Sequence, residues 1–253
     1  MKYTMPHWAF LLLSFFSLQA CSSSKPAVAV EKATATPRIL VFSKTNGFRH
    51  ESIPAGKAAL QQLGLSHQVQ VDTTEDATLF VTDSLQQYDA VVFLSTTMDV
   101  LDATQQLAFE EYIRGGGGYV GVHAAADTEY DWPWYNKLVG AYFSSHPQVQ
   151  KAQIQVLDKN HAATAHLPDV WEREDEWYNF KSMNPEVKVL ANLDEKSYTG
   201  GENGEKHPIA WYHSYDGGRA FYTALGHTSE SYSDSLFLKH LWGGISYAIG
   251  EGE

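Results

Sequence analysis

The stretch Arg114-Gly115-Gly116-Gly117-Gly118-Tyr119-Val120-Gly121-Val122-His123-Ala124-Ala125-Ala126-Asp127 decides the fold of this chain. It follows a predicted helix that starts near Asp102, whose side chain can cap the free N–H groups of the first turn. The four glycines end that helix, because glycine tolerates positive φ and loses much entropy inside a helix. Residues 119–122 then read as a buried strand, followed by a sharp turn and a new helix. His123 is therefore expected at the C-terminal end of a strand, the edge at which open α/β sheets bind ligands.

Buried strands and amphipathic helices alternate on both sides of this stretch. Apolar runs at 38–43 and 89–94 predict buried strands, and 67–72 alternates as a strand does. A helix from Ser52 to Gly64 separates the first two strands. Further on, the sequence predicts a helix over 132–139, strands around 154–156 and 187–193, a hairpin of 208–213 and 219–225, and a closing helix from about 233 to 250. Such alternation predicts parallel strands joined by right-handed crossovers.

The first 36 residues have a different character. Lys2 precedes an apolar run from about Trp8 to Ala20, which is too short to cross a bilayer. The run ends in Leu18-Gln19-Ala20-Cys21, which resembles a bacterial lipoprotein signal with cleavage before Cys21 and lipid on its sulfur; an ordinary signal peptide is the alternative. Residues 22–36 are rich in Ser, Ala, Pro and Thr and lack a hydrophobic period, as tethers do.

These features predict a signal peptide at 1–20, a lipidated Cys21 with a flexible tether at 21–36, and one α/β domain at 37–250. The expected location is the bacterial cell envelope, with the lipid as the sole membrane attachment. Ser22 after Cys21 favours the outer membrane, facing the periplasm, by resemblance to other lipoproteins.

Composition narrows the function classes. A length of 253 residues with 43% hydrophobic content is enough for one sizeable core. Cys21 is the single cysteine, so the chain has no intramolecular disulfide and its folded domain no thiol nucleophile. A net charge of −12 argues against nucleic acid and anionic lipid as partners.

Histidines at predicted strand ends are the leading candidates for catalysis. His123 follows one buried strand and His227 follows another, while His50 ends the loop after the first strand. A helix N-terminus behind His123 would disfavour imidazolium, and a neutral imidazole can accept a proton or bind a metal ion. Glu176 lies in an acidic and aromatic run, where one carboxylate turned inward would suit acid–base work. The alternative is a helix-capping role for His50 and a solvated position for His123, His227 and Glu176.

Other polar and aromatic residues near these positions are candidates for substrate binding. Aromatic rings offer an apolar surface to a ring-shaped ligand, although core packing is as common a role. A cation could fix a hydroxyl or an anionic group, although a surface salt bridge is its commoner use. The substrate-binding candidates are Lys44, Phe48, Arg49, Asp127, Trp132, Tyr135, His146, Asp175, Trp177, Tyr178 and Trp211.

Taken together, several motifs resemble the ThuA-like family, named for trehalose utilisation. They are Lys44–His50, Gly117–Ala124, Trp134-Tyr135 to Gly140 with Phe143 and His146-Pro147, Asp175–Tyr178, His207-Pro208 to Trp211, and Gly218-Arg219 to Gly226-His227. The resemblance spans about 37–250 and implies a flavodoxin-like three-layer sandwich, related to class I glutamine amidotransferases, with a mainly parallel sheet and a C-terminal hairpin plus helix. In those relatives the elbow carries cysteine; here His123 stands there and His227 answers to the histidine partner, which excludes glutaminase chemistry by a thiolate.

The resemblance implies the breakdown of glucosides, with 3-keto sugars as intermediates and a sugar oxidoreductase in the same pathway. An enzyme would act as a hydrolase or as a lyase or isomerase through His/Glu acid–base chemistry. A divalent metal such as zinc, with His123, His227 and His146 as candidate ligands, could assist, but no local spacing such as HExxH indicates it. The alternatives are a non-catalytic sugar-binding lipoprotein and a structural envelope protein.

Overall fold

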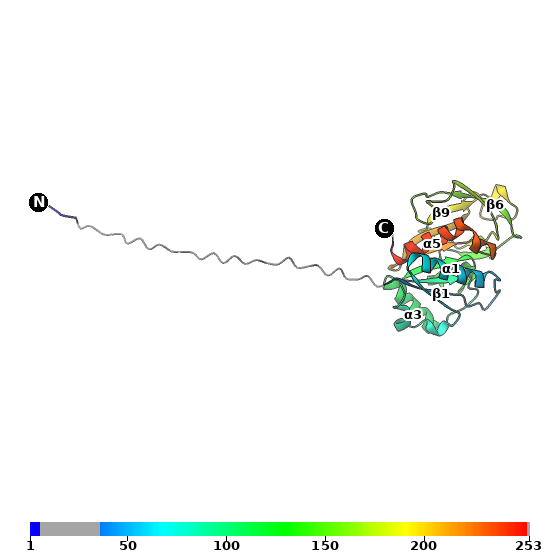
Figure 1. The fold of residues 1–253 in the computed structure, drawn as a ribbon, viewed down its shortest axis with the longest axis horizontal. Helices are drawn as coiled ribbons and strands as arrows, with labels where there is room; N and C mark the ends of the chain where they lie inside the picture. The colour runs from blue at the N-terminus through cyan, green and yellow to red at the C-terminus, as the bar shows by residue number, and fades with distance from the viewer. Residues whose placement is uncertain (6–35, 252–253) are drawn as a thin grey trace. The chain divides into compact units, whose positions relative to one another are not determined.

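The structure, a computed structural model, describes residues 1–5 and 36–251 (Figure 1). Residues from Thr36 onward form one compact unit, which holds all the described helices and strands. Cys21 and nearly all of the predicted signal peptide and tether fall at 6–35, outside the described residues. Within the described ranges, no helix has both the length and the apolar character needed to cross a bilayer.

A nine-stranded sheet forms the centre of this unit, in the order β2-β1-β3-β4-β11-β10-β9-β6-β7. Its first five strands are parallel: β2 (Gln70–Thr74), β1 (Arg38–Phe42), β3 (Ala90–Leu94), β4 (Gly118–Val122) and β11 (Gly218–Thr223). The other four pair antiparallel: β10 (Pro208–Tyr215), β9 (Lys188–Leu193), β6 (Gln150–Val156) and β7 (Val170–Asp175). The predicted flavodoxin-like α/β fold is confirmed, and an antiparallel wing extends its parallel half beyond the C-terminal hairpin.

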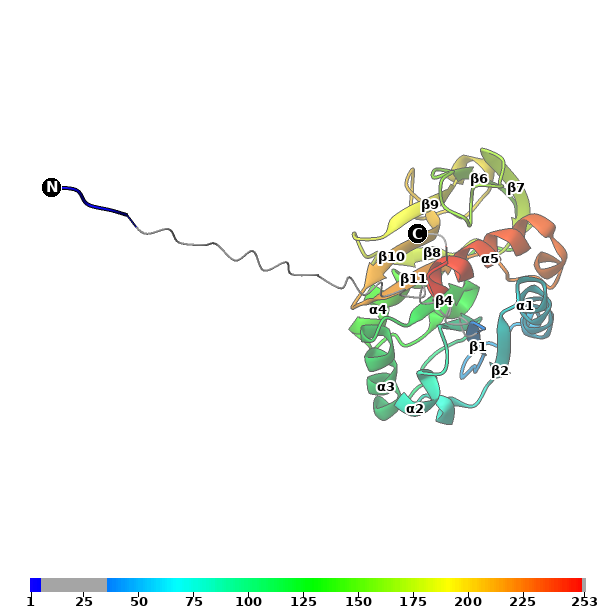
Figure 2. The same cartoon turned by 60° about the vertical axis from the view of Figure 1, so that its left-hand side comes forward.

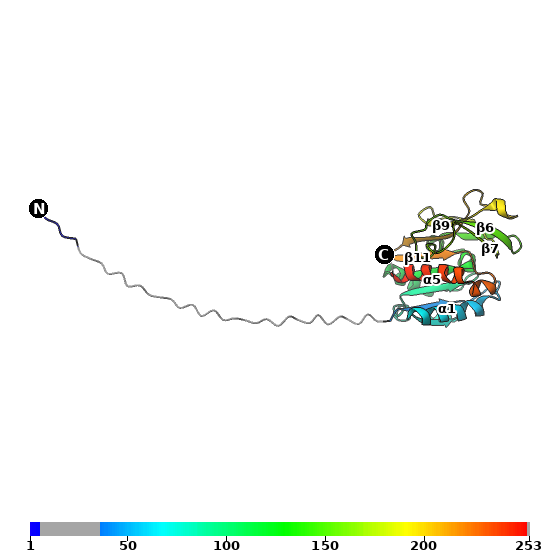
Figure 3. The ribbon, with the colours of Figure 1, turned by 45° about the horizontal axis from the view of Figure 1, so that its top comes forward.

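Helices cover both faces of the parallel half. Helices α1 (Ile53–His67) and α5 (Ser235–Ile249) lie side by side on one face (Figure 3). Helix α3 (Ala103–Arg114) lies on the other face with α2 (Thr82–Leu85) (Figure 2). Right-handed crossovers explain why the helices lie on opposite faces. The chain moves in one direction along the sheet from β1 to β2 and in the other from β3 to β4, so α1 and α3, which connect these pairs, cover different faces. The smaller elements are α4 (Pro133–Val139), the strand pair β5 (Tyr142–Ser145) and β8 (Asn179–Lys181), and the 3₁₀ helices η1 (Ala77–Leu79), η2 (His123–Asp127), η3 (Glu195–Ser197) and η4 (Glu230–Ser233).

The glycine joint ends α3 as the sequence predicts. Asp102 caps the start of α3 by accepting from the N–H groups of residues 104 and 105. At the other end Gly116 has φ +99°, and the N–H groups of Gly116 and Gly117 donate to the carbonyls of residues 113 and 112. This is the Schellman pattern, which needs a residue without a Cβ penalty at the left-handed position. Strand β4 begins at Gly118, where only glycine fits, because a Cβ there would lie 2.3 Å from the backbone oxygen of Ala248 in α5.

The prediction that α1 ends at Gly64 is wrong. The helix continues to His67 and ends at Gln68, which has φ 59°, so β2 begins at Gln70 and His67 belongs to the helix. Gly64 instead serves close packing, since a Cβ there would lie 2.6 Å from the carbonyl oxygen of Val69. Gly64 was predicted to end the helix, but a glycine is needed there because another part of the backbone passes close to it.

His240 on α5 is a buried histidine that connects this helix to the sheet. Its Nδ1 lies 2.8 Å from the carbonyl oxygen of Ala163 and its Nε2 lies 3.1 Å from Thr223 Oγ1, so a neutral ring satisfies both contacts. Burial, together with the nearby charges of His166, Arg173 and His161, lowers the pKa of His240 to about 3. The folded protein therefore resists protonation at this site.

Acid should destabilise the protein through His240. Because the folded-state pKa of about 3 lies below the unfolded value of about 6.5, the unfolded chain takes up this proton first. The contribution to the free energy of unfolding should therefore fall by about 1.4 kcal/mol per pH unit as the pH drops below 6.5. Urea titrations between pH 8 and 5 test this against His240→Asn, which keeps a donor near Ala163 and does not titrate. The variant should show the shallower slope; equal slopes would contradict the prediction.

Candidate active site

His123 lies at the turn directly after β4, in a left-handed backbone conformation with φ 51°. This conformation costs a residue with a Cβ about 1–2 kcal/mol, so the surrounding structure must hold it. The hydroxyl of Tyr222 donates to the His123 carbonyl at 2.8 Å, and His123 Nδ1 lies 2.8 Å from the carbonyl oxygen of Ala224. The predicted helix behind His123 is only the five-residue 3₁₀ helix η2, so the expected contribution of a helix dipole does not apply.

His227 reaches the same edge of the sheet from the neighbouring strand. Strands β4 and β11 are parallel and paired, so both of their C-terminal ends lie at one edge. His123 Nε2 and His227 Nδ1 are 3.1 Å apart, although 104 positions separate the two residues. Gly226, with φ +108°, makes the turn between β11 and His227. The structure thus brings together the two imidazoles that the sequence proposed for acid–base chemistry.

Glu176 joins the pair from the end of β7. Its Oε2 lies 3.1 Å from His227 Nδ1 and 3.4 Å from His123 Nε2, and its Oε1 lies 3.0 Å from His146 Nδ1. Burial raises the pKa of the Glu176 carboxyl, but the hydrogen bonds and charges of His123 and His227 outweigh it and hold that pKa below its ordinary value. Burial also lowers the pKa of His227, while Glu176 raises it, and the net pKa of His227 is raised.

His50 completes the cluster from the loop after β1. Its ring centroid is 4.7 Å from that of His123 and 5.2 Å from that of His227. His50 is buried, and its Nδ1 has no hydrogen-bond partner among the described residues. Burial, with the charges of His123 and His227, lowers the pKa of His50 to about 3. Nearby, Ser52 Oγ donates to the Gly226 carbonyl at 3.2 Å, which connects this loop to the segment that carries His227.

The four side chains fit a divalent metal ion. One ligand atom from each of His50, His123, Glu176 and His227 lies within 4.8 Å of the other three. In a neutral ring the His123 Nδ1–H donates to the Ala224 carbonyl, which leaves the Nε2 lone pair facing the Glu176 carboxylate. His227 Nδ1 lies 3.1 Å from both of these acceptors, so either its N–H or a bound cation can satisfy them. Imidazole nitrogens and one carboxylate suit zinc, and a backbone carbonyl behind a ligating histidine is its usual support.

Aromatic and acidic side chains surround the cluster on the η2 side. The Tyr178 ring lies against His123 with centroids 4.3 Å apart, and Phe143 packs on Tyr178 at the same distance. Asp127 accepts a hydrogen bond of 2.5 Å from the Tyr130 hydroxyl. Burial raises the pKa of the Asp127 carboxyl, against the opposing effects of Tyr130 and His123. His146, a predicted metal candidate, lies at the rim as a partner of Glu176, outside the four-residue set.

Of the aromatic residues predicted to bind substrate, Tyr178 packs on His123, whereas the tryptophans and Tyr135 belong to the core. Trp177, Trp211, Trp132 and Tyr135 are buried, and their polar atoms bond elsewhere in the core: to the carbonyls of Gln150, Val139 and Ala125, and to the Glu110 carboxylate. The two predicted cations are also engaged elsewhere. Lys44 Nζ donates to the Val100 carbonyl, and Arg49 makes a two-pronged ion pair with Glu75.

Two supporting residues were missed as candidates. His207 is buried with Nδ1 2.8 Å from Glu195 Oε1 and Nε2 2.8 Å from the Tyr178 carbonyl, so it fixes the segment that packs on His123. Arg173 is buried beside Asp175, with its Nη2 3.0 Å from Asp175 Oδ2. A histidine before the first residue of β10 and an arginine inside an acidic run were the available signals, but neither position indicates burial.

A hollow of about 440 Å³ opens beside His50 and His227. Phe48, 66% exposed, and Val149, 40% exposed, provide apolar surface there, while hydroxyl and charged groups provide the rest. Its lining residues are Phe48, Arg49, His50, Glu51, Ser52, Val149, His227, Thr228, Ser229 and Glu230. A small ligand could therefore approach the cluster from this side.

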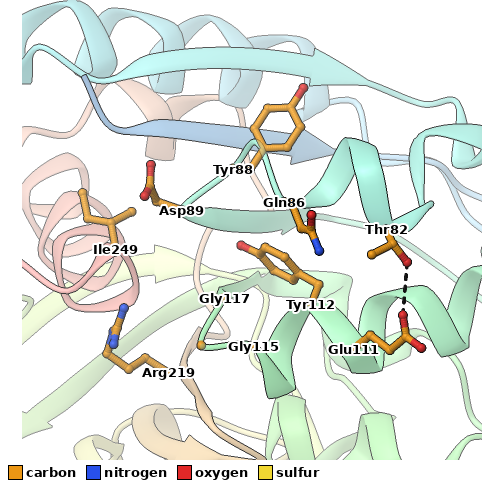
Figure 4. A pocket seen from close by; sticks show the side chains of 11 residues that line it. Thr82, Gln86, Tyr88, Asp89, Glu111, Tyr112, Gly115, Gly117, Arg219 and Ile249 are labelled. Atoms are coloured by element: carbon orange, nitrogen blue, oxygen red, sulfur yellow. Dashed lines mark hydrogen bonds between the residues drawn. The ribbon is translucent and has the colours of Figure 1, made fainter. Parts of the chain in front are cut away.

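Another hollow, of about 360 Å³, lies at the opposite edge of the parallel strands (Figure 4). It is lined by Tyr88 and Asp89 before β3, by Glu111 and Tyr112 of α3, and by Arg219. None of the described histidines lines it. Because α/β sheets bind ligands at the C-terminal ends of their strands, the histidine cluster is the better candidate site.

Comparisons with known proteins agree with this fold. The model of the ThuA family, described as trehalose utilisation, matches residues 38–248. A ThuA-like protein from Bacteroides uniformis is 23% identical with a TM-score of 0.73, over 91% of this chain and 97% of that one. A ThuA-like protein from Parabacteroides merdae is 23% identical with a TM-score of 0.70, over 85% and 91%. A β-galactosidase from Bacillus circulans shares 13% identity with a TM-score of 0.57, over 85% of this chain but 31% of its own, which shows the fold alone. No curated protein matches.

Proposed function

Because this chain belongs to the ThuA family, whose description is trehalose utilisation, we propose that it is an enzyme that breaks down a carbohydrate at the histidine cluster. The substrate class is a glucoside of the trehalose type, or its 3-keto derivative. The observation that carries the proposal is the meeting of His50, His123, His227 and Glu176 at the C-terminal edge of the parallel strands. Structural roles alone do not require three imidazoles and a carboxylate within 4.8 Å of one another.

These four residues would hold a divalent metal such as zinc. A bound divalent metal supplies Lewis-acid polarisation of a carbonyl or hydroxyl oxygen. The His123 Nδ1–H bond to the Ala224 carbonyl fixes the ring so that Nε2 faces the cluster. Tyr178 packs on that ring and keeps water from one of its faces.

Proton transfer falls to residues beside the ligands. Asp127 lies close enough to His123 and His146 for their charges to act on it, and burial raises the pKa of its carboxyl, which favours proton exchange nearer to neutral pH. In elimination from a keto-glycoside, a base removes the proton next to the carbonyl, the bond to the leaving oxygen breaks, and an acid protonates that oxygen. We assign these two roles to Asp127 and the rim residue His146.

A second candidate function is non-catalytic sugar binding. The exposed Phe48 and Val149 favour it, because they offer an apolar surface to a sugar without requiring the histidines. In either case we propose attachment to the envelope through a lipidated Cys21, in the outer membrane facing the periplasm. A sugar oxidoreductase that makes the keto-sugar is the proposed partner in the pathway.

Metal analysis and a substrate screen test the proposal on one sample. We expect the purified protein to contain about one divalent ion per chain and to convert glucosides or 3-keto-glucosides, with activity lost on chelation and restored by metal. Turnover unchanged by the chelator, in protein without bound metal, would remove the metal from the proposal. Sugar binding without turnover would favour the binding function, and neither binding nor turnover would leave a structural protein.

A further inference from the structure

Asp175 is a fully buried carboxylate next to the cluster, with no exposure through which a substrate could reach it. Its Oδ1 accepts from the backbone N–H of Glu176 at 3.0 Å and of His227 at 3.1 Å. Its Oδ2 accepts from the N–H of Gly226 at 3.0 Å and from Arg173 at 3.0 Å. One side chain thus holds the backbone of two cluster residues from two distant segments.

The strand order explains why Asp175 has to link the two segments directly. Strand β7, which leads to Glu176, is the edge strand, and three strands separate it from β11, which leads to His227 (Figure 2). No ladder of the sheet joins β7 to β11. The hydrogen bonds from Gly226 and His227 to Asp175 are direct bonds that close this gap.

Arg173 balances the buried charge of Asp175. Its guanidinium lies over the rings of Trp171 and Phe237, at 4.9 and 5.0 Å, and its Nη2 also donates to Ser231 Oγ at 2.7 Å. A lone carboxylate would be costly in this place, whereas a paired and fully hydrogen-bonded one is tolerated. The pair therefore has the form of a fixed support and not of a group that exchanges protons with a substrate.

We propose that Asp175, charge-balanced by Arg173, is the positioning residue that sets Glu176 and His227 at ligand distance in the cluster. This positioning role replaces the substrate-binding role that the sequence predicted for Asp175, because the side chain is fully buried. The inference rests on the proposed function, because a metal ion is what requires this spacing. Supports behind metal ligands are typically worth about 10–100-fold in metal affinity.

Asp175→Asn tests the proposal, since an amide has one acceptor oxygen and can satisfy only one of the two sets of donors. We expect Co²⁺ to bind about 10–100-fold more weakly than to the wild type, with an altered visible absorption band. Glu174→Gln is the matched control, because Glu174 is the exposed neighbour on the same strand and its change removes the same charge. Wild-type affinity and an unchanged band in Asp175→Asn would overturn the proposal.

A second measurement separates this proposal from the proposed function. Amide hydrogen exchange at Gly226 and His227 should speed up in Asp175→Asn whether or not the protein binds metal. If the wild type binds no Co²⁺, the proposed metal site fails, while faster exchange at these two amides still supports the positioning role. Unchanged exchange would overturn it. Should Asp175→Asn fail to fold, Ser231→Ala removes one partner of the pair, and an unchanged Co²⁺ affinity in that variant would also count against the proposal.

Discussion

Glu176→Gln should lower the turnover of the sugar substrate by about 10²–10⁴-fold, which corresponds to losing the several kcal/mol of charge stabilisation that a metal held by this carboxylate would supply. The carboxylate is the single anionic member of the four-residue cluster, and its two oxygens contact three histidines. The amide has nearly the same shape but carries no charge and only one acceptor oxygen. Steady-state kinetics on the substrate found in the screen provide the measurement.

The metal content and a control variant show whether the loss of turnover comes from the Glu176 carboxylate. Metal content should fall in the same variant, because an amide oxygen is a weaker ligand than a carboxylate. The control is Glu172→Gln, a change at an exposed position of β7 that should leave both activity and metal content as in the wild type. Wild-type turnover in Glu176→Gln would exclude this carboxylate from the chemistry.

His123→Ala and His123→Gly should both lose turnover by a similar factor, about 10²–10⁴-fold, because both remove a ligand of the proposed metal, but they should differ in stability. Both remove the imidazole and its bond to the Ala224 carbonyl. Only glycine adopts φ near 51° without a Cβ penalty. His123→Gly should therefore be more stable than His123→Ala by about 1 kcal/mol, the smaller end of the left-handed penalty.

Urea unfolding of the two variants measures this difference directly. Both proteins lack the imidazole contacts, so the comparison reports the backbone conformation of the turn, offset by the entropy that glycine adds to the unfolded chain. A glycine variant that is equal to or less stable than the alanine variant would mean that the turn relaxes when the imidazole is gone. In that case the left-handed conformation would be a consequence of the His123 contacts and not a property of the elbow.

Much of the fold was predictable because local physics decides it. The Asp102 cap, the glycine joint and the apolar run at 119–122 each depend on residues that are close together in the sequence. The observed bounds of α3 and β4 agree with these predictions. Gly64 was read wrongly because glycine has two uses, ending a helix and admitting a close neighbour. Only the position of Val69 distinguishes them.

The candidate site was predictable in part. His50, His123, His227 and Glu176 were all named from strand ends and acidic runs, and the structure brings them together. The tryptophans were assigned to the ligand because an aromatic run does not show which way its rings face. In the structure Trp177 and Trp211 face the core, while Phe48 lies exposed at the hollow.

The sequence by itself determined the family, the alternation of strands and helices, and the delivery of His123 and His227 to one edge of the sheet. These depend on capping, hydrophobic periodicity and parallel pairing, which act over short distances along the chain or between neighbouring strands. The tertiary structure alone decided that Glu176 meets them and that Asp175 supports the meeting. The reason is physical: the end of the edge strand β7 is placed by the pairing of the three strands between it and β11 and by buried hydrogen bonds to Asp175, and no local pattern of residues encodes these long-range contacts.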